Sequence, residues 1–326
     1  MKVNCQNNSN ISFKGFYNNK MLKKGLEFAA NNGTLFAAST TLVFSTFRPL
    51  IILATPNTDK KNKQIACSKS ITSSVNGYLI ALACSRPFSN AIEKIDKNPE
   101  LYLKKETINY LKDLNKNLVE SDSYLFGTQL FKLGLGFIIA APKAFLTALM
   151  TPYMTKLITN YETISKKNNS NNENLSFQGK DKLPTFIGRI LDNKNLQAFL
   201  IKNNKSNFPM HTIAATDTLS TAVFVHEINS HKNFKREEKK PLIYNSIIST
   251  TLSILSTYII DNLTKNSTNK FIENFKKVNK NDAKLTKYIE GIKIAKPILI
   301  AGTMYYCLIP LISTFFADRI KTDKIN

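Results

Sequence analysis

Residues 242–262 read LIYNSIISTTLSILSTYIIDN, and this stretch decides the expected fold. Its first nineteen residues, 242–260, carry no charge, and a charged segment, FKREEKKP at residues 234–241, comes directly before it. A helix needs about 20 mostly apolar residues to cross the hydrocarbon core of a bilayer. The stretch therefore predicts a membrane-spanning helix, and a second uncharged stretch at residues 297–317 predicts another.

An earlier part of the chain repeats the pattern of this stretch. Residues 69–74, KSITSS, align with residues 245–250, NSIIST, at an offset of 176. Shorter matches, such as Thr41-Leu42 with Thr218-Leu219, follow at an offset of 177. Each half then has the same order of elements: apolar run, basic linker, apolar run, charged amphipathic segment, apolar run. We therefore predict two copies of one helical unit.

The predicted fold is all-α: a polytopic membrane helical bundle of about six spans, formed by two three-helix repeats plus amphipathic surface helices. The expected spans are residues 35–54, 65–91, 130–158, 210–228, 242–260 and 297–317. The expected surface helices are residues 21–31, 94–122, 185–201 with Thr185 as its N-cap, and 265–293. The uncharged part of the second run, residues 70–85, is short and rich in Ser, Ala and Gly, which favours a helix packed inside the protein.

These elements divide the chain into five parts. They are a disordered N-terminal tail (1–19), the first helical repeat (20–160), an Asn/Lys-rich linker (161–184), an amphipathic helix with the second helical repeat (185–320), and a C-terminal tail (321–326).

The net charge of the chain is +22, and its source is lysine rather than arginine. The lysines are spread over every linker, whereas a nucleic-acid module needs clustered Arg with aromatic stacking or a recognisable fold. We therefore expect no nucleic-acid partner, and we expect the basic loops to meet anionic lipid headgroups. The four cysteines are too far apart to suggest a metal or redox motif.

The sequence contains no constellation that predicts catalysis. His226-Glu227 with His231 resembles a zinc-protease motif, but that motif needs histidines four residues apart, and here they are five apart. Gly127, Gly134 and Gly136 match no phosphate-binding fingerprint. We expect no enzyme activity, no cofactor and no metal.

Single charges inside apolar runs are the better candidates for function. An ionisable group at membrane depth costs at least about 2.5–3.5 kcal/mol, so it usually faces a partner or a water-filled cavity. Arg48, Lys143 and Asp217 are such groups. Arg48 and Asp217 lie in repeat-related runs, so we predict an intramembrane charge pair between them near the pseudo-two-fold axis. The alternative is that each lies near a helix end and reaches water; for Lys143, next to Pro142, this alternative is favoured.

Three spans per repeat is an odd number, so the second copy is expected to enter the membrane from the opposite side. Inverted repeats of this kind occur in many secondary transporters, which favours a transporter-like protein by analogy. Two alternatives stay open. One is a structural or partner-binding membrane protein with basic lipid-facing loops, and the other is a soluble helical bundle.

Three short segments carry a resemblance to other proteins. They are ISFKG at residues 11–15; Arg48-Pro49 followed by Lys60-Lys61 and Ser70-Ile71; and KKPLIYN at residues 239–245. With them, the organisation of the chain resembles a group of uncharacterised multi-pass membrane proteins from AT-rich bacterial genomes. The resemblance implies a membrane location, expected to be the bacterial inner membrane, and it implies no activity.

Overall fold

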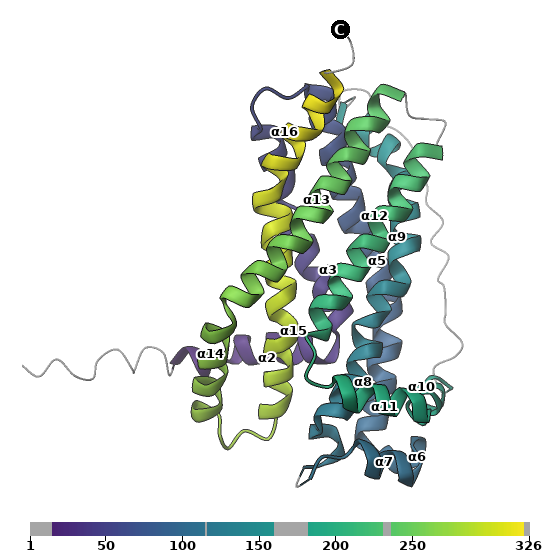
Figure 1. Cartoon of the computed structure of the whole chain (residues 1–326), viewed down its shortest axis with the longest axis vertical. Helices are drawn as coiled ribbons and strands as arrows, with labels where there is room; N and C mark the ends of the chain where they lie inside the picture. The colour runs from purple at the N-terminus through teal and green to yellow at the C-terminus, as the bar shows by residue number, and fades with distance from the viewer. Residues whose placement is uncertain (1–14, 115, 160–181, 231–235, 323–326) are drawn as a thin grey trace, which may run out of the picture.

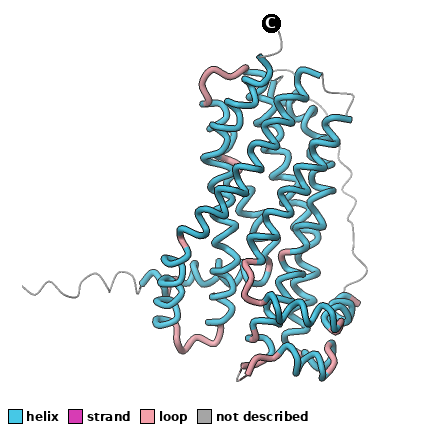
Figure 2. The backbone as a smooth tube through the Cα atoms, viewed as in Figure 1, coloured by secondary structure: helices cyan, strands magenta, loops and turns pink. Residues whose placement is uncertain are grey.

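The computed structural model describes residues 15–114, 116–159, 182–230 and 236–322, and in these ranges the chain is α-helical without a strand (Figures 1 and 2). The helices of the first half are α2 (Lys20–Asn31), α3 (Gly33–Phe44), α4 (Phe47–Ala54), α5 (Lys60–Lys97), α6 (Pro99–Tyr102), α7 (Lys105–Leu111), the 3-10 helix η1 (Leu118–Glu120), α8 (Asp122–Lys132) and α9 (Gly134–Thr159). Those of the second half are α10 (Leu183–Leu191), α11 (Lys194–Asn203), α12 (Phe208–Ser230), α13 (Arg236–Leu263), α14 (Lys265–Val278), α15 (Leu285–Thr303), the π-helical turn η2 (Met304–Leu308) and α16 (Ile309–Thr322).

The long helices lie side by side along the longest axis of the molecule, and the short helices gather at one end (Figure 1). We call this the short-helix end; it holds α2, α6, α7, α10, α11 and α14. There, Ile95 at the end of α5 shares a core cluster with Tyr124 of α8 and Ile187 of α10. At the opposite end, the far end, Ile65 of α5 shares a cluster with Ile228 of α12 and Leu242 of α13.

These two clusters establish the direction in which the helices run. α5 and α13 both begin at the far end, and α3–α4 and α12 both run toward it (Figure 1). The two halves therefore run in the same direction, and the segments that follow α4 and α12 share one end. The expectation of an inverted second half is wrong for this arrangement. Its physical reason is that α9 ends at the far end, whereas α10 and α12 begin again at the short-helix end.

Corresponding helices of the two halves pack in corresponding ways. α5 packs along α9, and α13 packs along α16. α3 and α4 pack on α5, as α12 packs on α13. Across the halves, α12 packs along α9, and α3 packs on α15. The result is a bundle whose central space is bordered by helices from both halves.

The burial pattern of α13 is the reverse of that of a helix in a water-soluble protein. Large apolar side chains such as Ile247, Leu255 and Ile259 are exposed on it. Its polar side chains face the interior: Asn245, Ser246, Ser249, Thr250, Ser253 and Thr257 are all buried. α5 repeats the pattern, with Val75 and Leu79 exposed and its polar residues Ser70, Thr72, Ser74 and Asn76 buried. The same reversal thus occurs in both halves.

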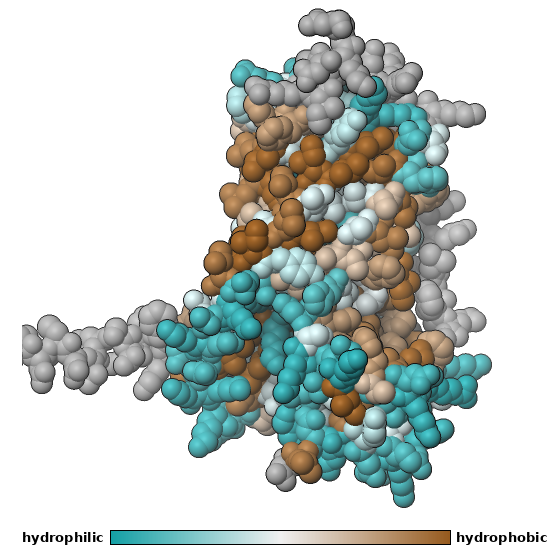
Figure 3. All heavy atoms as spheres, in the orientation of Figure 1, coloured by the Kyte–Doolittle hydropathy of each residue, from teal (hydrophilic) through white to brown (hydrophobic). Residues whose placement is uncertain are grey.

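Within the described ranges, four helical stretches are long and apolar enough to cross a membrane: Gly33–Ala54, Asp122–Ile158, Lys239–Leu263 and Leu285–Ala317. On the face seen in Figure 3, apolar side chains cover the long helices, and polar side chains cover the short-helix end. The expected spans at residues 65–91 and 210–228 form α5 and α12. Neither is among the four, because both are rich in Ser and Thr and carry charged residues.

The expected surface helices are present in part. Residues 21–31 form α2, whose N-terminus is capped by the Asn19 side chain. The single helix expected at residues 94–122 is wrong, because α5 continues to Lys97 and Pro99 begins the separate helix α6. Residues 185–201 form two helices, since Asn193 caps a new one, and Thr185 is not an N-cap because α10 begins at Leu183. Residues 265–293 are likewise divided between α14 and α15.

Most of the expected tails and the expected linker lie outside the described residues, which leave out 1–14, 160–181 and 323–326. Tyr17, within the expected N-terminal tail, is buried. Its ring lies 5.2 Å from that of Phe271 and 6.2 Å from that of Phe275, both on α14. The folded part of the chain therefore begins before α2.

Candidate functional site

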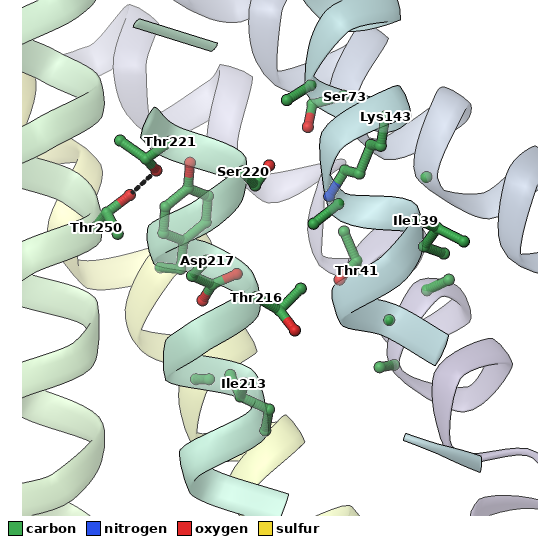
Figure 4. A pocket seen from close by; sticks show the side chains of 18 of the residues that line it. Thr41, Ser73, Ile139, Lys143, Ile213, Thr216, Asp217, Ser220, Thr221 and Thr250 are labelled. Atoms are coloured by element: carbon green, nitrogen blue, oxygen red, sulfur yellow. Dashed lines mark hydrogen bonds between the residues drawn. The ribbon is translucent and has the colours of Figure 1, made fainter. Parts of the chain in front are cut away.

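A cavity of about 190 Å³ lies in the centre of the bundle (Figure 4). It is bordered by α3, α5, α9 and α12, with contributions from α13, α15 and η2. Since a cavity needs only about 10–15 Å³ of such space to hold a water molecule, this one has room for several. Helices of both halves thus border a space large enough for a small molecule.

Lys143 of α9 and Asp217 of α12 face each other across this cavity, together with Thr216 (Figure 4). Each is partly exposed, and both line the cavity. Their charges act on each other, but among the described residues no hydrogen bond or ion pair joins them. The sequence-based alternative for Lys143, a position near a helix end, is wrong, because Lys143 lies inside α9 and borders the cavity.

A glycine on α5 makes room for the Lys143 side chain. A Cβ atom added at Gly77 would lie 3.0 Å from Cε and 3.4 Å from Nζ of Lys143. The separation from Cε is tighter than an ordinary contact, so a methyl group at position 77 would push the lysine side chain aside by a few tenths of an ångström. Gly77 therefore helps to determine where the ammonium group of Lys143 lies.

Lys69 of α5 is the second cation of the cavity wall. Its Nζ atom donates a hydrogen bond to the Ser246 hydroxyl of α13 and lies 4.3 Å from the centre of the Phe224 ring. The Ser246 hydroxyl in turn donates to the Leu242 carbonyl at 2.6 Å. Both partners of Lys69 are electrically neutral. The sequence did not single out Lys69, and its alignment with Asn245 in the repeat is the one signal that could have done so.

Arg48 does not line the cavity but supports its wall. Its guanidinium group donates to the Tyr305 carbonyl, donates to the Ser249 hydroxyl at 3.1 Å, and stacks on the Tyr305 ring at 4.1 Å. Tyr305 belongs to η2, and both Tyr305 and Tyr306 border the cavity. A π-helical turn widens the helix and disturbs the usual i to i+4 hydrogen-bond ladder. Arg48 thus satisfies a carbonyl at an irregular turn.

The structure does not bring Arg48 and Asp217 into contact. Within the described residues, the charge that acts on Asp217 is that of Lys143. Arg48 instead donates its hydrogen bonds to Tyr305 and Ser249. Lys143, and not Arg48, is therefore the charged group that faces Asp217 across the cavity.

Hydroxyl groups make up much of the remaining polar lining. The Thr221 and Thr250 hydroxyls are 2.6 Å apart and join α12 to α13 (Figure 4). Ser73 and Ser220 also border the cavity. Hydroxyls donate and accept hydrogen bonds, so this lining can solvate a polar ligand of either charge.

A buried charge pair lies outside the cavity. Lys132 Nζ is 3.5 Å from Glu290 Oε1, and both side chains are almost fully buried. Gln129 Nε2 is 3.4 Å from the same carboxylate oxygen. The pair ties α8 to α15. Sequence reasoning missed this ion pair because Lys132 is a single charge that interrupts an apolar run, and nothing in the sequence connects it to Glu290.

His226 and Glu227 lie near the end of α12, while His231 lies outside the described residues. In the described part of the chain, no group of three or more His, Cys, Asp or Glu side chains could hold a metal ion. No family model, no curated protein and no solved structure matches the chain. A functional proposal therefore depends on the geometry of the cavity and on the outer surface.

Proposed function

We propose that the chain is an integral membrane protein. The observation that carries this proposal is the reversed burial of α5 and α13, whose polar residues face inward and whose large apolar residues face outward. In water, exposing so much apolar surface is unfavourable, and soluble monomers rarely do it. In a bilayer, the same arrangement places apolar side chains against lipid tails and keeps polar ones inside the bundle, away from the lipid.

The six long helical segments are proposed to form two repeats that run in the same direction. The order of elements supports this, since each half has surface helix, long segment, long segment, surface helix, long segment. A contact between the halves supports it as well. Lys69 aligns with Asn245, and it is hydrogen-bonded to Ser246, the residue that follows Asn245. Contact between nearly equivalent positions is expected close to a two-fold axis between two copies.

The proposed activity is binding and transfer of a small polar solute, in the manner of a transporter. A cavity with three charged side chains, bordered by helices of both proposed repeats, supports it. Transporters commonly bind their substrates between two repeats. The lysines of α2 and α14 at the short-helix end are proposed to meet anionic lipid headgroups.

The connection between the halves favours a second candidate. α9 ends at the far end of the bundle, and α10 begins at the short-helix end. A bilayer lying across the bundle would place these ends on opposite sides. Residues 160–181 connect α9 to α10 in the sequence, and they contain no apolar run of the length that a further membrane span needs. In the second candidate, other protein subunits instead of lipid cover the apolar surface, and the chain is a partner-binding component of an assembly.

Cysteine labelling separates the two candidates. In a background without the natural cysteines, single cysteines are introduced at Lys60 and Lys240 near the far end and at Lys202 at the short-helix end. Intact cells or sealed vesicles are then treated with a membrane-impermeant maleimide. A spanning bundle gives the same result at 60 and 240 and the opposite result at 202. Equal labelling of all three positions from one side would exclude the spanning arrangement and favour the second candidate.

Membrane extraction provides an independent measurement. An integral protein stays in the membrane pellet at alkaline pH and needs detergent for release. If alkaline carbonate releases the chain without detergent, the integral membrane proposal fails.

A further inference from the structure

We propose that the central cavity binds a small anion, a carboxylate or a phosphate group, through the ammonium groups of Lys143 and Lys69. This inference rests on the proposed solute-binding function and names the class of solute. The cavity is the same one; the new element is the charge of its occupant.

The balance of charge in the cavity carries the inference. Two lysines and one aspartate line it, so its formal charge is +1 with all three ionised. The positive guanidinium of Arg48 lies directly behind Tyr305, at 4.1 Å from the ring. Charges held away from bulk water are costly unless they are paired, and within the described residues Asp217 is the one acidic side chain that lines the space. An anion between the two lysines supplies the missing negative charge.

The hydrogen-bonding capacity of the lysines points the same way. An ammonium group has three N–H donors. Lys69 uses one on Ser246 and presents its charge to the Phe224 ring, which leaves two donors for a ligand in the cavity that it lines. For Lys143, no hydrogen bond from Nζ to another described residue is present, so its three donors are open to a ligand. Charge-assisted hydrogen bonds of this kind are about twice as strong as neutral ones.

Hydroxyl groups complete the anion site, and Asp217 orients the Lys143 side chain. Ser73 on α5 and Thr216 and Ser220 on α12 border the same space as Lys143 and can donate to anion oxygens (Figure 4). Asp217 lies on the opposite wall and attracts the Lys143 ammonium toward the cavity. Gly77 keeps the path of that side chain open. The volume, about 190 Å³, suits an anion of few heavy atoms.

The test uses the full chain purified in detergent, at constant ionic strength. The melting temperature is measured against increasing concentrations of inorganic phosphate, acetate, or methylammonium. The expected result is a saturable rise with phosphate or acetate and none with methylammonium. A response to acetate alone identifies a carboxylate ligand, and a response to phosphate alone identifies a phosphate ligand. A rise with methylammonium instead, or no saturable rise with either anion, overturns the inference.

Matched variants locate the binding site. Lys143→Gln and Lys69→Gln should each weaken the apparent affinity for the anion by about tenfold or more, because each removes one charge-assisted contact. Lys202→Gln, an exposed lysine on α11, should leave it unchanged. Equal affinity in all three variants would place the anion on the surface and refute the cavity site.

A second pair of variants, at two glycines, tests the anion site if a lysine variant does not fold. Gly77→Ala retains every charge but displaces the Lys143 side chain, so it should weaken anion binding severalfold. Gly25→Ala on α2, where a Cβ meets nothing within 4 Å, should not. If anions fail to bind while cysteine labelling still reports a spanning bundle, the proposed membrane function stands and only the ligand class is wrong.

Discussion

Arg48 binds the same residue in two ways: its guanidinium donates to the Tyr305 backbone carbonyl and stacks at 4.1 Å on the Tyr305 ring. The flat guanidinium can do both because its donors lie in its plane and its face is free to stack. The contact joins α4 of the first half to η2 of the second. It therefore stabilises the side of the cavity formed by Tyr305, and it also joins the two halves of the chain.

Replacing Arg48 by Lys should destabilise the protein, although the charge is kept. A lysine donates from one compact ammonium group and cannot stack while it serves both Tyr305 and Ser249. We expect a loss of about 1–3 kcal/mol, measured by thermal unfolding in detergent. Arg189→Lys, at an exposed position of α10, is the control and should have no effect. Equal stability of Arg48→Lys and wild type would show that the stacked geometry contributes nothing.

The Lys132–Glu290 pair gives a prediction about buried charge. Removing one partner leaves the other charged, buried and unpaired, which costs about 3–5 kcal/mol. We expect Lys132→Met and Glu290→Met each to lower the melting temperature strongly. The double variant should recover much of the loss, because no uncompensated charge is left. A double-mutant cycle measures the coupling, and purely additive losses would contradict it.

Gly291, which packs against α2, and Gly25, on the exposed side of α2, provide a matched comparison. A Cβ at Gly291 of α15 would lie 2.1 Å from the Leu26 carbonyl oxygen of α2, and a backbone atom cannot move aside as a side-chain end can. Gly291→Ala should therefore separate the two helices and destabilise the fold by about 1–3 kcal/mol or more.

Gly25→Ala, on α2 itself, should be neutral or stabilising by up to about 1 kcal/mol, since alanine favours helix and the added carbon meets open space. Thermal unfolding of both variants makes the comparison. A Gly291→Ala protein as stable as Gly25→Ala would mean that α2 does not pack closely on α15.

Asp282, between α14 and α15, gives a pH prediction at the short-helix end. The Lys284 N–H donates to its Oδ1 at 3.0 Å, and Lys23 Nζ lies 3.0 Å from its Oδ2. These two contacts hold the pKa of Asp282 below its ordinary value. A carboxyl with a depressed pKa stabilises the fold above its unfolded pKa, about 3.9, and this contribution is lost as the pH falls through the folded pKa.

Asp282→Asn should accordingly be less stable than wild type at neutral pH, and the difference should shrink as the pH falls below about 4. Unfolding measured across this range is the test. Glu100→Gln, an exposed acidic position on α6, is the control. A difference that stays constant with pH would show that the carboxylate charge is not the cause.

The sequence predicts the long helices because the length of an uncharged run carries that information. Residues 242–260 lie within α13, and residues 297–317 lie within α15, η2 and α16. The breaks in the surface helices were missed because they depend on local capping, such as the Asn193 side chain at the start of α11. The direction of the second half was also missed. Counting apolar runs assumes that each helix begins at the end of the bundle where the previous helix finished.

The candidate site was predicted only in part, for a related reason. Asp217 and Lys143 stand out because each is a single charge in an apolar run. Lys69 follows a polar linker, and its place at the cavity depends on how α5 is rotated against α12 and α13. The partner of Arg48 is a backbone carbonyl at a π-helical turn, and a backbone group has no signature in residue type. Packing between distant segments decides both cases.

The hydrogen bond between Lys69 and Ser246 also bears on how such a chain can change over evolutionary time. In an assembly of two identical units, a lysine close to the two-fold axis would lie near its own copy, and the two positive charges would repel. When one polypeptide carries both units, the two positions mutate independently, so a lysine on one side can face a hydroxyl on the other. If the proposed repeats come from one unit, joining the two copies therefore permits an asymmetric interior, with a cation near the axis on one side only.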